Sequence, residues 1–168
     1  HRTLAFITLG ASAMLQVRPA HGPALRAAER GAGILAHLAG QSRRPDWTWF
    51  EAMLAYDNPR MPQALIAAGM ALGRNDWLEI GLDTLRWICE RQIAAAGHFR
   101  PIGSEGFGQD YGHMPFDQQP LEAQAALDAC AAAFAADGGP HWRRYGLAAW
   151  NWFFGANDRG EVLADPVS

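Results

Sequence analysis

The chain contains no lysine, so all 14 of its basic residues are arginine. The absence of lysine and the abundance of alanine are typical of a GC-rich bacterial genome and indicate no particular function. Net charge is also small, with a formal value of -3 at pH 7. This balance gives no electrostatic reason to expect nucleic acid or an anionic membrane as a partner.

Cysteine is scarce, and its scarcity excludes two classes of protein. The two cysteines, Cys89 and Cys130, form neither a disulfide framework nor a metal cluster. Each lies inside an apolar helical pattern, which predicts buried, reduced thiols. His98 and His113 lack the tight spacing of zinc ligands, so we expect no metal and no other cofactor.

Long hydrophobic runs are missing as well. The apolar segment from Leu4 to Val17 contains Gln16 and is followed by Arg18, well short of the ~20 residues of a membrane span. No small-residue cleavage site with a basic leader is evident, so we expect a cytoplasmic protein without a membrane partner. An apolar helical pattern begins directly after His1, and residues 155–160 form a loop, which predicts one domain over 1–168 that is a fragment of a longer protein.

Helical periodicity is the main pattern that the sequence does contain. Apolar residues recur at helical spacing without any convincing alternating strand, which predicts an all-α fold. The expected helices span residues 3–17, 22–39, 61–73, 76–93, 119–136 and 140–154.

The expected loops alternate between short and long, which pairs the helices into three antiparallel hairpins. Both long connectors, about 41–60 and 94–118, then leave the same end of the array. An internal repeat supports the pairing, because an offset of 65 residues carries four positions of one hairpin onto the next: Trp77, Gly81, Leu82 and Trp87 onto Trp142, Gly146, Leu147 and Trp152. Such units stack as an open solenoid or a closed ring, and in a ring the connectors lead into one shared polar basin.

The first long connector combines aromatic rings with carboxylates and an amide. Glu51 and Asp57 are its candidate acid and base, and Asn58 is a candidate partner for a hydroxyl group. Trp47 and Trp49 are candidate platforms for a sugar ring or nucleobase. The alternative is structural: the tryptophans plug the hairpin junction, Glu51 tops a helical turn, and Asp57 or Asn58 caps the next helix.

The second long connector is rich in glycine and polar side chains. Asp117, Gln118 and Glu122 lie where it enters the fifth helix. The alternative here is that Asp117 is only an N-cap and Glu122 only a first-turn acid. The other polar residues of this stretch are His98, Arg100, Glu105, Asp110, Tyr111, His113 and Gln119.

A serine nucleophile finds little support, because Ser104 lacks the strand-turn-helix setting of a nucleophile elbow. Carboxylate and histidine acid/base chemistry remains. It suits glycosyl transfer to water or phosphate, epimerisation of a sugar, or sugar binding without a reaction.

Five motifs resemble the bacterial six-hairpin glycosidase-like proteins, which are (α/α)6 toroids often encoded beside or fused to glycosyltransferases. They are Trp47-x-Trp-Phe-Glu51, Tyr56-Asp-Asn58, Gly97-His-Phe99, Phe116-Asp-Gln-Gln-Pro-x-Glu122 and Trp152-Phe-Phe-Gly-x-Asn-Asp158. The resemblance implies a carbohydrate-active domain, and the three hairpins correspond to half of a toroid.

The resemblance and the loop chemistry together give the expected site. The catalytic candidates are Glu51, Asp57 and Asp117, and the substrate-binding candidates are Trp47, Trp49, Tyr56, Asn58, His98, Gln118, Gln119 and Glu122. Two alternatives stay open: a non-catalytic module that binds glycans or scaffolds a glycosyltransferase, and a sugar 2-epimerase with His98 or His113 as proton carrier. A half-toroid also exposes apolar flanks on its first and last helices, which predicts a homodimer or poor solubility.

Overall fold

The computed structural model describes residues 1–103 and 117–164. These residues form helices and connectors without a named strand, so the predicted all-α class is confirmed. The helices are α1 (Arg2–Val17), α2 (Gly22–Ser42), α3 (Arg60–Leu72), α4 (Asn75–Arg91), α5 (Pro120–Asp137) and α6 (Pro140–Trp152).

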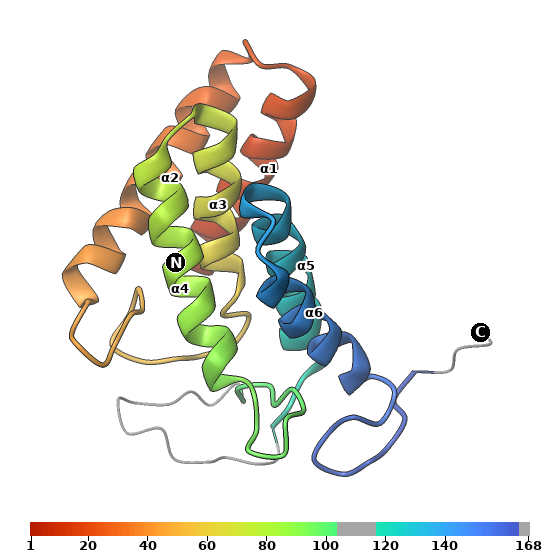
Figure 1. Ribbon diagram of the computed structural model, residues 1–168. Coiled ribbons are helices and arrows are strands. Elements are labelled where there is room, and N and C mark those ends of the chain that lie inside the picture. The colour runs from red at the N-terminus through yellow and green to blue at the C-terminus, as the bar shows by residue number, and fades with distance from the viewer. Residues whose placement is uncertain (104–116, 165–168) are drawn as a thin grey trace.

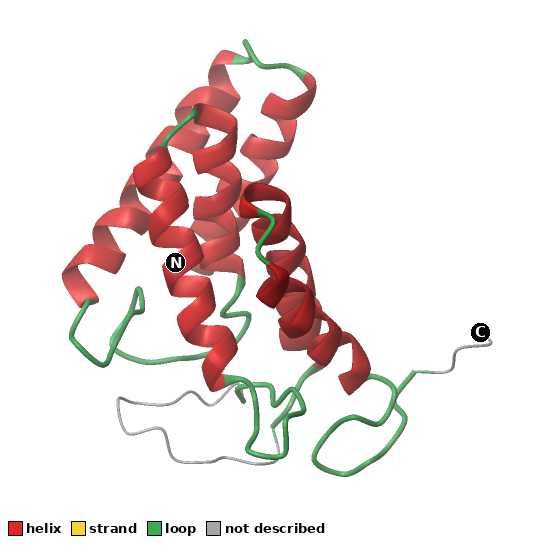
Figure 2. Cartoon of the chain, viewed as in Figure 1, coloured by secondary structure: helices red, strands yellow, loops and turns green. Residues whose placement is uncertain are grey.

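The helices pack as three antiparallel hairpins, which confirms the predicted pairing (Figure 1). The short turns between paired helices lie at the upper end in this view. The described parts of the long connectors and the segment that follows α6 lie at the lower end (Figure 2). We call residues 43–59 the first connector, residues 92–103 and 117–119 the second connector, and residues 153–164 the third connector.

Local sequence explains where the hairpins turn. Gly73 and Gly138 end α3 and α5 in the left-handed conformation, with φ of 65° and 71°, which glycine adopts without a Cβ clash. Pro120 and Pro140 occupy the first turns of α5 and α6, where the missing N–H is not needed. The hairpin geometry therefore follows from turn chemistry in the sequence.

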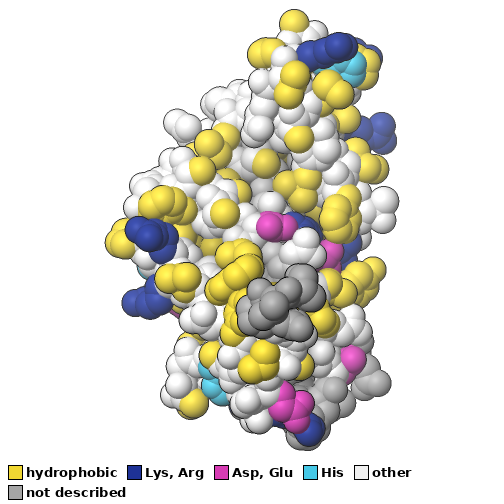
Figure 3. Space-filling view, turned by 90° about the vertical axis from the view of Figure 1, so that its right-hand side faces the viewer, with side chains coloured by type: hydrophobic (Ala, Val, Ile, Leu, Met, Phe, Trp, Pro, Cys, Tyr) yellow, Lys and Arg dark blue, Asp and Glu magenta, His cyan; other side chains and the backbone are white. Residues whose placement is uncertain are grey.

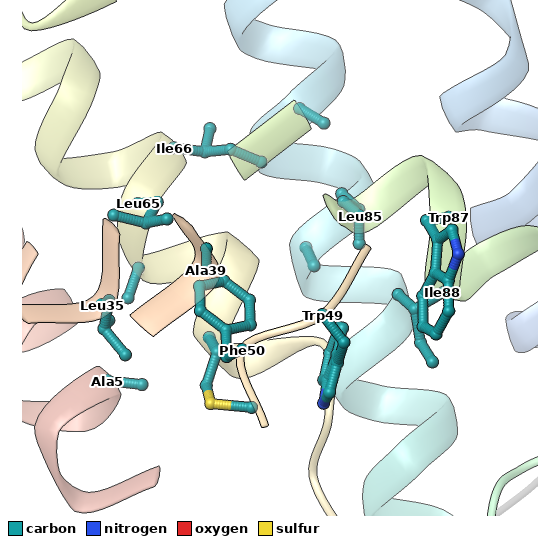
Figure 4. Packing of buried hydrophobic residues seen from close by; sticks show 14 of the residues in the cluster. Ala5, Leu35, Ala39, Trp49, Phe50, Leu65, Ile66, Leu85, Trp87 and Ile88 are labelled. Carbon is teal, nitrogen blue, oxygen red and sulfur yellow. The ribbon is translucent and has the colours of Figure 1, made fainter. Parts of the chain in front are cut away.

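The core forms where the first connector closes over the helices. Trp49 and Phe50 lie between Leu35 and Ala39 of α2 on one side and Leu85, Trp87 and Ile88 of α4 on the other (Figure 4). The rings of Trp49 and Trp87 are stacked, with centroids 5.9 Å apart. The first connector is thus part of the hydrophobic core.

Gly81 and Gly146 are equivalent in the internal repeat but differ in surroundings. A Cβ on Gly81 would lie 2.8 Å from Ile66 Cγ1 and 3.0 Å from the backbone nitrogen of Ile66. A Cβ on Gly146 would meet its nearest neighbours at an ordinary 3.5 Å. At this position of the repeat, the second hairpin is therefore packed more closely than the third.

We expect Gly81→Ala to lower the free energy of unfolding by about 1–3 kcal/mol, because backbone atoms block the added methyl group. Gly146→Ala should be neutral or raise it by up to about 1 kcal/mol, since alanine favours a helix interior. Urea unfolding of both variants measures the difference. Equal effects of the two substitutions would contradict the packing described here.

Apolar side chains are exposed on the outer helices. Phe6 and Ile7 of α1 and Leu147 and Trp150 of α6 are each about half exposed. Figure 3 looks at the side where α5 and α6 lie and shows hydrophobic side chains spread over this face. Within residues 1–103 and 117–164, no helix combines the length and apolarity that a membrane crossing requires.

Candidate functional site

The first and second connectors meet at the carboxylate of Glu122, in the first turn of α5. Its Oε1 accepts hydrogen bonds from the backbone N–H of Asn58 at 3.0 Å and from Asn58 Nδ2 at 3.3 Å. Its Oε2 accepts one from Gln92 Nε2, just after α4, at 3.0 Å. Segments that are 64 residues apart in sequence thus converge on one side chain, as the alternating loop lengths predict. We call Asn58, Gln92 and Glu122 the Glu122 cluster.

All three members of the Glu122 cluster are fully buried. Burial raises the pKa of Glu122 from its ordinary 4.5 to about 7, and the nearby charge of Asp57 acts in the same direction. The hydrogen bonds from Asn58 and Gln92 oppose this rise. Glu122 is therefore a carboxyl group whose pKa lies near neutral pH. It is also the acid in the first turn of α5, as the structural alternative predicts.

Gln92 has one unsatisfied atom in this cluster. Its side chain is inaccessible to solvent, and its Oε1 has no hydrogen-bond partner among the described residues. A buried acceptor without a donor is costly, so one more hydrogen-bond donor to Gln92 Oε1 would stabilise the cluster. A protonated Glu122 supplies such a donor if the amide of Gln92 turns over.

Asp57 lies beside this cluster in an unusual backbone conformation. Its φ is 52°, in the left-handed region that aspartate tolerates better than most residues. Burial is the main cause that raises its pKa, while Arg60, whose Nε lies 3.4 Å from Asp57 Oδ1, lowers it. The capping alternative for Asp57 and Asn58 is wrong, because Pro59 is the N-cap of α3 and no side chain caps it.

Glu51 is held in an ion pair. Arg2 Nη1 lies 2.6 Å and His1 Nδ1 2.7 Å from its two carboxylate oxygens. Arg2 also donates to the carbonyl of Tyr56 and to Asn58 Oδ1. The start of α1 is thereby tied to the first connector, and Glu51 is a carboxylate that already has a cationic partner in Arg2.

The two tryptophans of the first connector lie in the core. Trp47 is 5% exposed and Trp49 is 1% exposed, so neither ring offers an open face to a sugar. Trp47 Nε1 donates to the Glu51 carbonyl at 2.7 Å. Their positions agree with the structural alternative, in which they plug the hairpin junction. Tyr56 is the exposed ring of this connector, at 49%, and Arg2 lies over it.

A second polar cluster forms around Asp158 of the third connector. Its carboxylate accepts hydrogen bonds from Arg100 Nε at 3.0 Å, His98 Nε2 at 2.8 Å and Gln118 Nε2 at 2.6 Å. Gln118 Oε1 in turn accepts from Trp152 Nε1 at 3.2 Å. We call His98, Arg100, Gln118 and Asp158 the Asp158 cluster. It joins the second connector to the third.

The guanidinium of Arg100 is the main reason that the pKa of Asp158 lies well below its ordinary value. Asp158 is therefore an anion at any physiological pH. It was not among the site residues predicted from the sequence, although it ends one of the motifs that carry the family resemblance. A single sequence does not reveal that partners 40 and 60 residues away converge on it.

A cavity of about 680 Å³ adjoins the Asp158 cluster. Its volume is in the range of ligand sites for small molecules. The lining side chains offer carboxylate, amide and guanidinium groups beside one indole, and they are Gln118, Pro120, Trp152, Asn157, Asp158, Arg159, Glu161 and Leu163. Asn157 shapes one wall, because its Nδ2 donates to the carbonyls of Trp152 and Glu161.

The remaining predicted residues have simpler positions. Gln119 is the N-cap of α5 and makes no side-chain capping bond. Asp117 packs against Gly103, where an added Cβ would lie 3.3 Å from Asp117 Cβ. Glu105, Asp110, Tyr111 and His113 lie outside the described residues.

No group of three or more His, Cys, Asp or Glu side chains within the described ranges has the arrangement of a metal site. Comparison of the chain with protein-family models, with curated proteins and with solved structures finds no match. The resemblance to six-hairpin glycosidase-like proteins therefore rests on the sequence motifs alone.

Proposed function

We propose that the protein is a carbohydrate-active domain of the six-hairpin glycosidase-like type, with its hairpins forming part of an (α/α)6 toroid. The observation that carries the proposal is the cavity beside the Asp158 cluster, at the end of the molecule where the connectors meet. Four of the five motifs behind the resemblance contribute a residue to this cluster or to the Glu122 cluster.

The chemistry of the cavity suits a glycan. The carboxylates of Asp158 and Glu161 can accept hydrogen bonds from sugar hydroxyls. Asp158 contributes fixed negative charge, and hydrogen bonds from three side chains, His98, Arg100 and Gln118, hold it in one orientation. Among the acid/base candidates, Asp57 has a raised pKa, whereas Glu51 is committed to an ion pair. Glu122, a substrate-binding candidate, also has a raised pKa.

A non-catalytic glycan-binding module is the second candidate function. It is favoured by the states of the three carboxyl groups: Glu51 is paired, Glu122 is fully buried, and Asp158 is surrounded by donors. A glycosidase needs two carboxyl groups that flank the scissile bond.

The rest of the proposal includes a cytoplasmic location and a homodimer through the apolar flanks of α1 and α6.

Replacing Asp158 with asparagine tests the proposal. The substitution removes the charge that Arg100 and His98 bind, so the wall of the cavity loses its fixed geometry. We expect calorimetry with glucose and mannose oligosaccharides to show binding by the wild-type protein and at least a tenfold loss, about 1.4 kcal/mol, in Asp158→Asn. A product assay on the same mixtures separates hydrolysis from binding alone, and solvent deuterium at the sugar C2 identifies epimerisation.

Asp76→Asn is the matched control. Asp76 is an exposed carboxylate in the first turn of α4, at the opposite end of the molecule, where it pairs with Arg74. This variant should bind as the wild-type protein does. Unchanged affinity in Asp158→Asn, with the helical circular dichroism of the wild type, would refute the assignment of the cavity.

A further inference from the structure

Cys89 of α4 and Cys130 of α5 face each other across the boundary between two hairpins. Their sulfur atoms are 3.7 Å apart, and each residue is 2% exposed. Both are free thiols, as the apolar pattern around them predicts. Neither belongs to the Glu122 cluster or the Asp158 cluster, so the site described above gives this contact no role.

Cys130 lines a cavity that Cys89 does not line. A cavity of about 280 Å³ lies between α5 and α6, and Cys130, Ala131, Gly146 and Leu147 are among the residues that line it. The internal repeat explains the space, because the offset of 65 residues places Ile66 of the second hairpin at the position of Ala131. Ile66 packs closely against Gly81, whereas the methyl group of Ala131 leaves the corresponding room beside Gly146 empty.

We propose that Cys89 and Cys130 are a redox-active pair that a small peroxide converts to a disulfide between α4 and α5. In the first step the sulfur of Cys130 attacks one peroxide oxygen, the O–O bond breaks, and water leaves, so that Cys130 carries a sulfenic acid. In the second step the sulfur of Cys89 attacks the sulfur of Cys130, and the hydroxyl leaves as water with the proton of Cys89. Two thiols lose two electrons, and one peroxide is reduced to two waters.

The surroundings divide the roles between the two thiols. Hydrogen bonding to Cys130 and burial raise the pKa of Cys89 well above its ordinary value, so Cys89 holds its proton until that proton leaves with the hydroxyl of Cys130. Cys130, and not Cys89, is among the residues that line the cavity, so an entering peroxide reaches Cys130 first. Cys89 is in contact with it and serves as the resolving thiol.

The disulfide requires only a short movement, because the sulfur atoms must approach from 3.7 Å to about 2.05 Å. It closes a chain segment of 41 residues that contains the second connector. On α4 the bridge lies one turn before Gln92, whose side chain binds Glu122. Oxidation therefore fastens the same pair of helices that the Glu122 cluster joins, and it should raise the thermal midpoint of unfolding.

Thiol counting on the folded wild-type protein tests the proposal. We expect hydrogen peroxide to remove both thiols, to lower the intact mass by two hydrogen atoms, and to leave a peptide in which Cys89 and Cys130 are linked. Dithiothreitol should restore both thiols and the original thermal midpoint. Thiols that react only after unfolding, or a product linked between two chains, would overturn the proposal.

Two variants identify the roles. Cys89→Ala should stop at a sulfenic acid on Cys130, which dimedone traps, while the wild-type protein gives no lasting adduct. Ala131→Ile places in the cavity the side chain that the second hairpin already has, and it should slow the loss of thiols severalfold. Oxidation of Ala131→Ile at the wild-type rate would exclude entry through this cavity.

Discussion

Replacing Trp49 with alanine should lower the free energy of unfolding by about 3–5 kcal/mol, the usual cost of removing a large buried aromatic side chain. The ring is 1% exposed, is stacked on Trp87, and meets Phe50 edge to face with centroids 5.3 Å apart. Its removal leaves a cavity between α2 and α4. Chemical denaturation followed by tryptophan fluorescence or circular dichroism measures the loss.

Two controls separate packing from ligand contact. Trp49→Phe should cost less than Trp49→Ala, because Trp49 Nε1 has no hydrogen-bond partner among the described residues and only ring area is lost. Tyr56→Ala, at the exposed ring of the same connector, should cost about 1 kcal/mol or less. If Trp49→Ala were as stable as the wild-type protein and had lost glycan binding, Trp49 would instead be a platform for a sugar ring.

Replacing Glu122 with glutamine should remove a pH dependence of stability. At pH values below 4.5 the carboxyl group is protonated in both the folded and the unfolded chain. As the pH rises from 4.5 to about 7, the unfolded chain releases this proton while the folded chain keeps it, so folding loses stability. The total loss is about 3 kcal/mol, and it is complete above the folded-state pKa.

The glutamine variant has no such proton, and its amide can donate to Gln92 Oε1 once the amide of Gln92 turns over. Relative to the wild-type protein, Glu122→Gln should therefore gain about 3 kcal/mol in the free energy of unfolding between pH 4.5 and pH 8. Urea unfolding at the two pH values measures this gain. Asp57, which is also buried and faces Arg60, titrates in both proteins.

Glu79→Gln provides the comparison, because Glu79 is exposed on α4. The difference in free energy of unfolding between Glu79→Gln and the wild-type protein should be the same at pH 4.5 and pH 8. A Glu122→Gln variant that behaves in the same way would show that Glu122 is ionised in the folded protein throughout this range.

The sequence was sufficient to predict the helices and their pairing because both depend on local signals. Apolar periodicity, left-handed glycines such as Gly73 and Gly138, and first-turn prolines act within a few residues. Loop lengths then fixed which end of the array holds the connectors. The meeting of Asn58 with Glu122 follows from that arrangement.

The partners of individual site residues were beyond the sequence, since they depend on contacts over 40 or more positions. Trp49 lies in a connector whose composition is that expected of a binding loop. The connector nevertheless folds back and buries Trp49 against Trp87. Glu51 is neutralised by Arg2, which precedes it by 49 residues. Asp158 gathers donors from two distant segments, and this role is visible only when the chain is folded.

Amide hydrogen exchange at Asn58 tests most directly whether Glu122 joins the two connectors. The backbone N–H of Asn58 is buried and donates to Glu122 Oε1, so it should exchange as slowly as the helical amides of α3 in the wild-type protein. In Glu122→Ala it should exchange at least tenfold faster, about 1.4 kcal/mol, relative to those amides. An Asn58 amide that exchanges in the wild-type protein as fast as an exposed loop would contradict the convergence on which the candidate site depends.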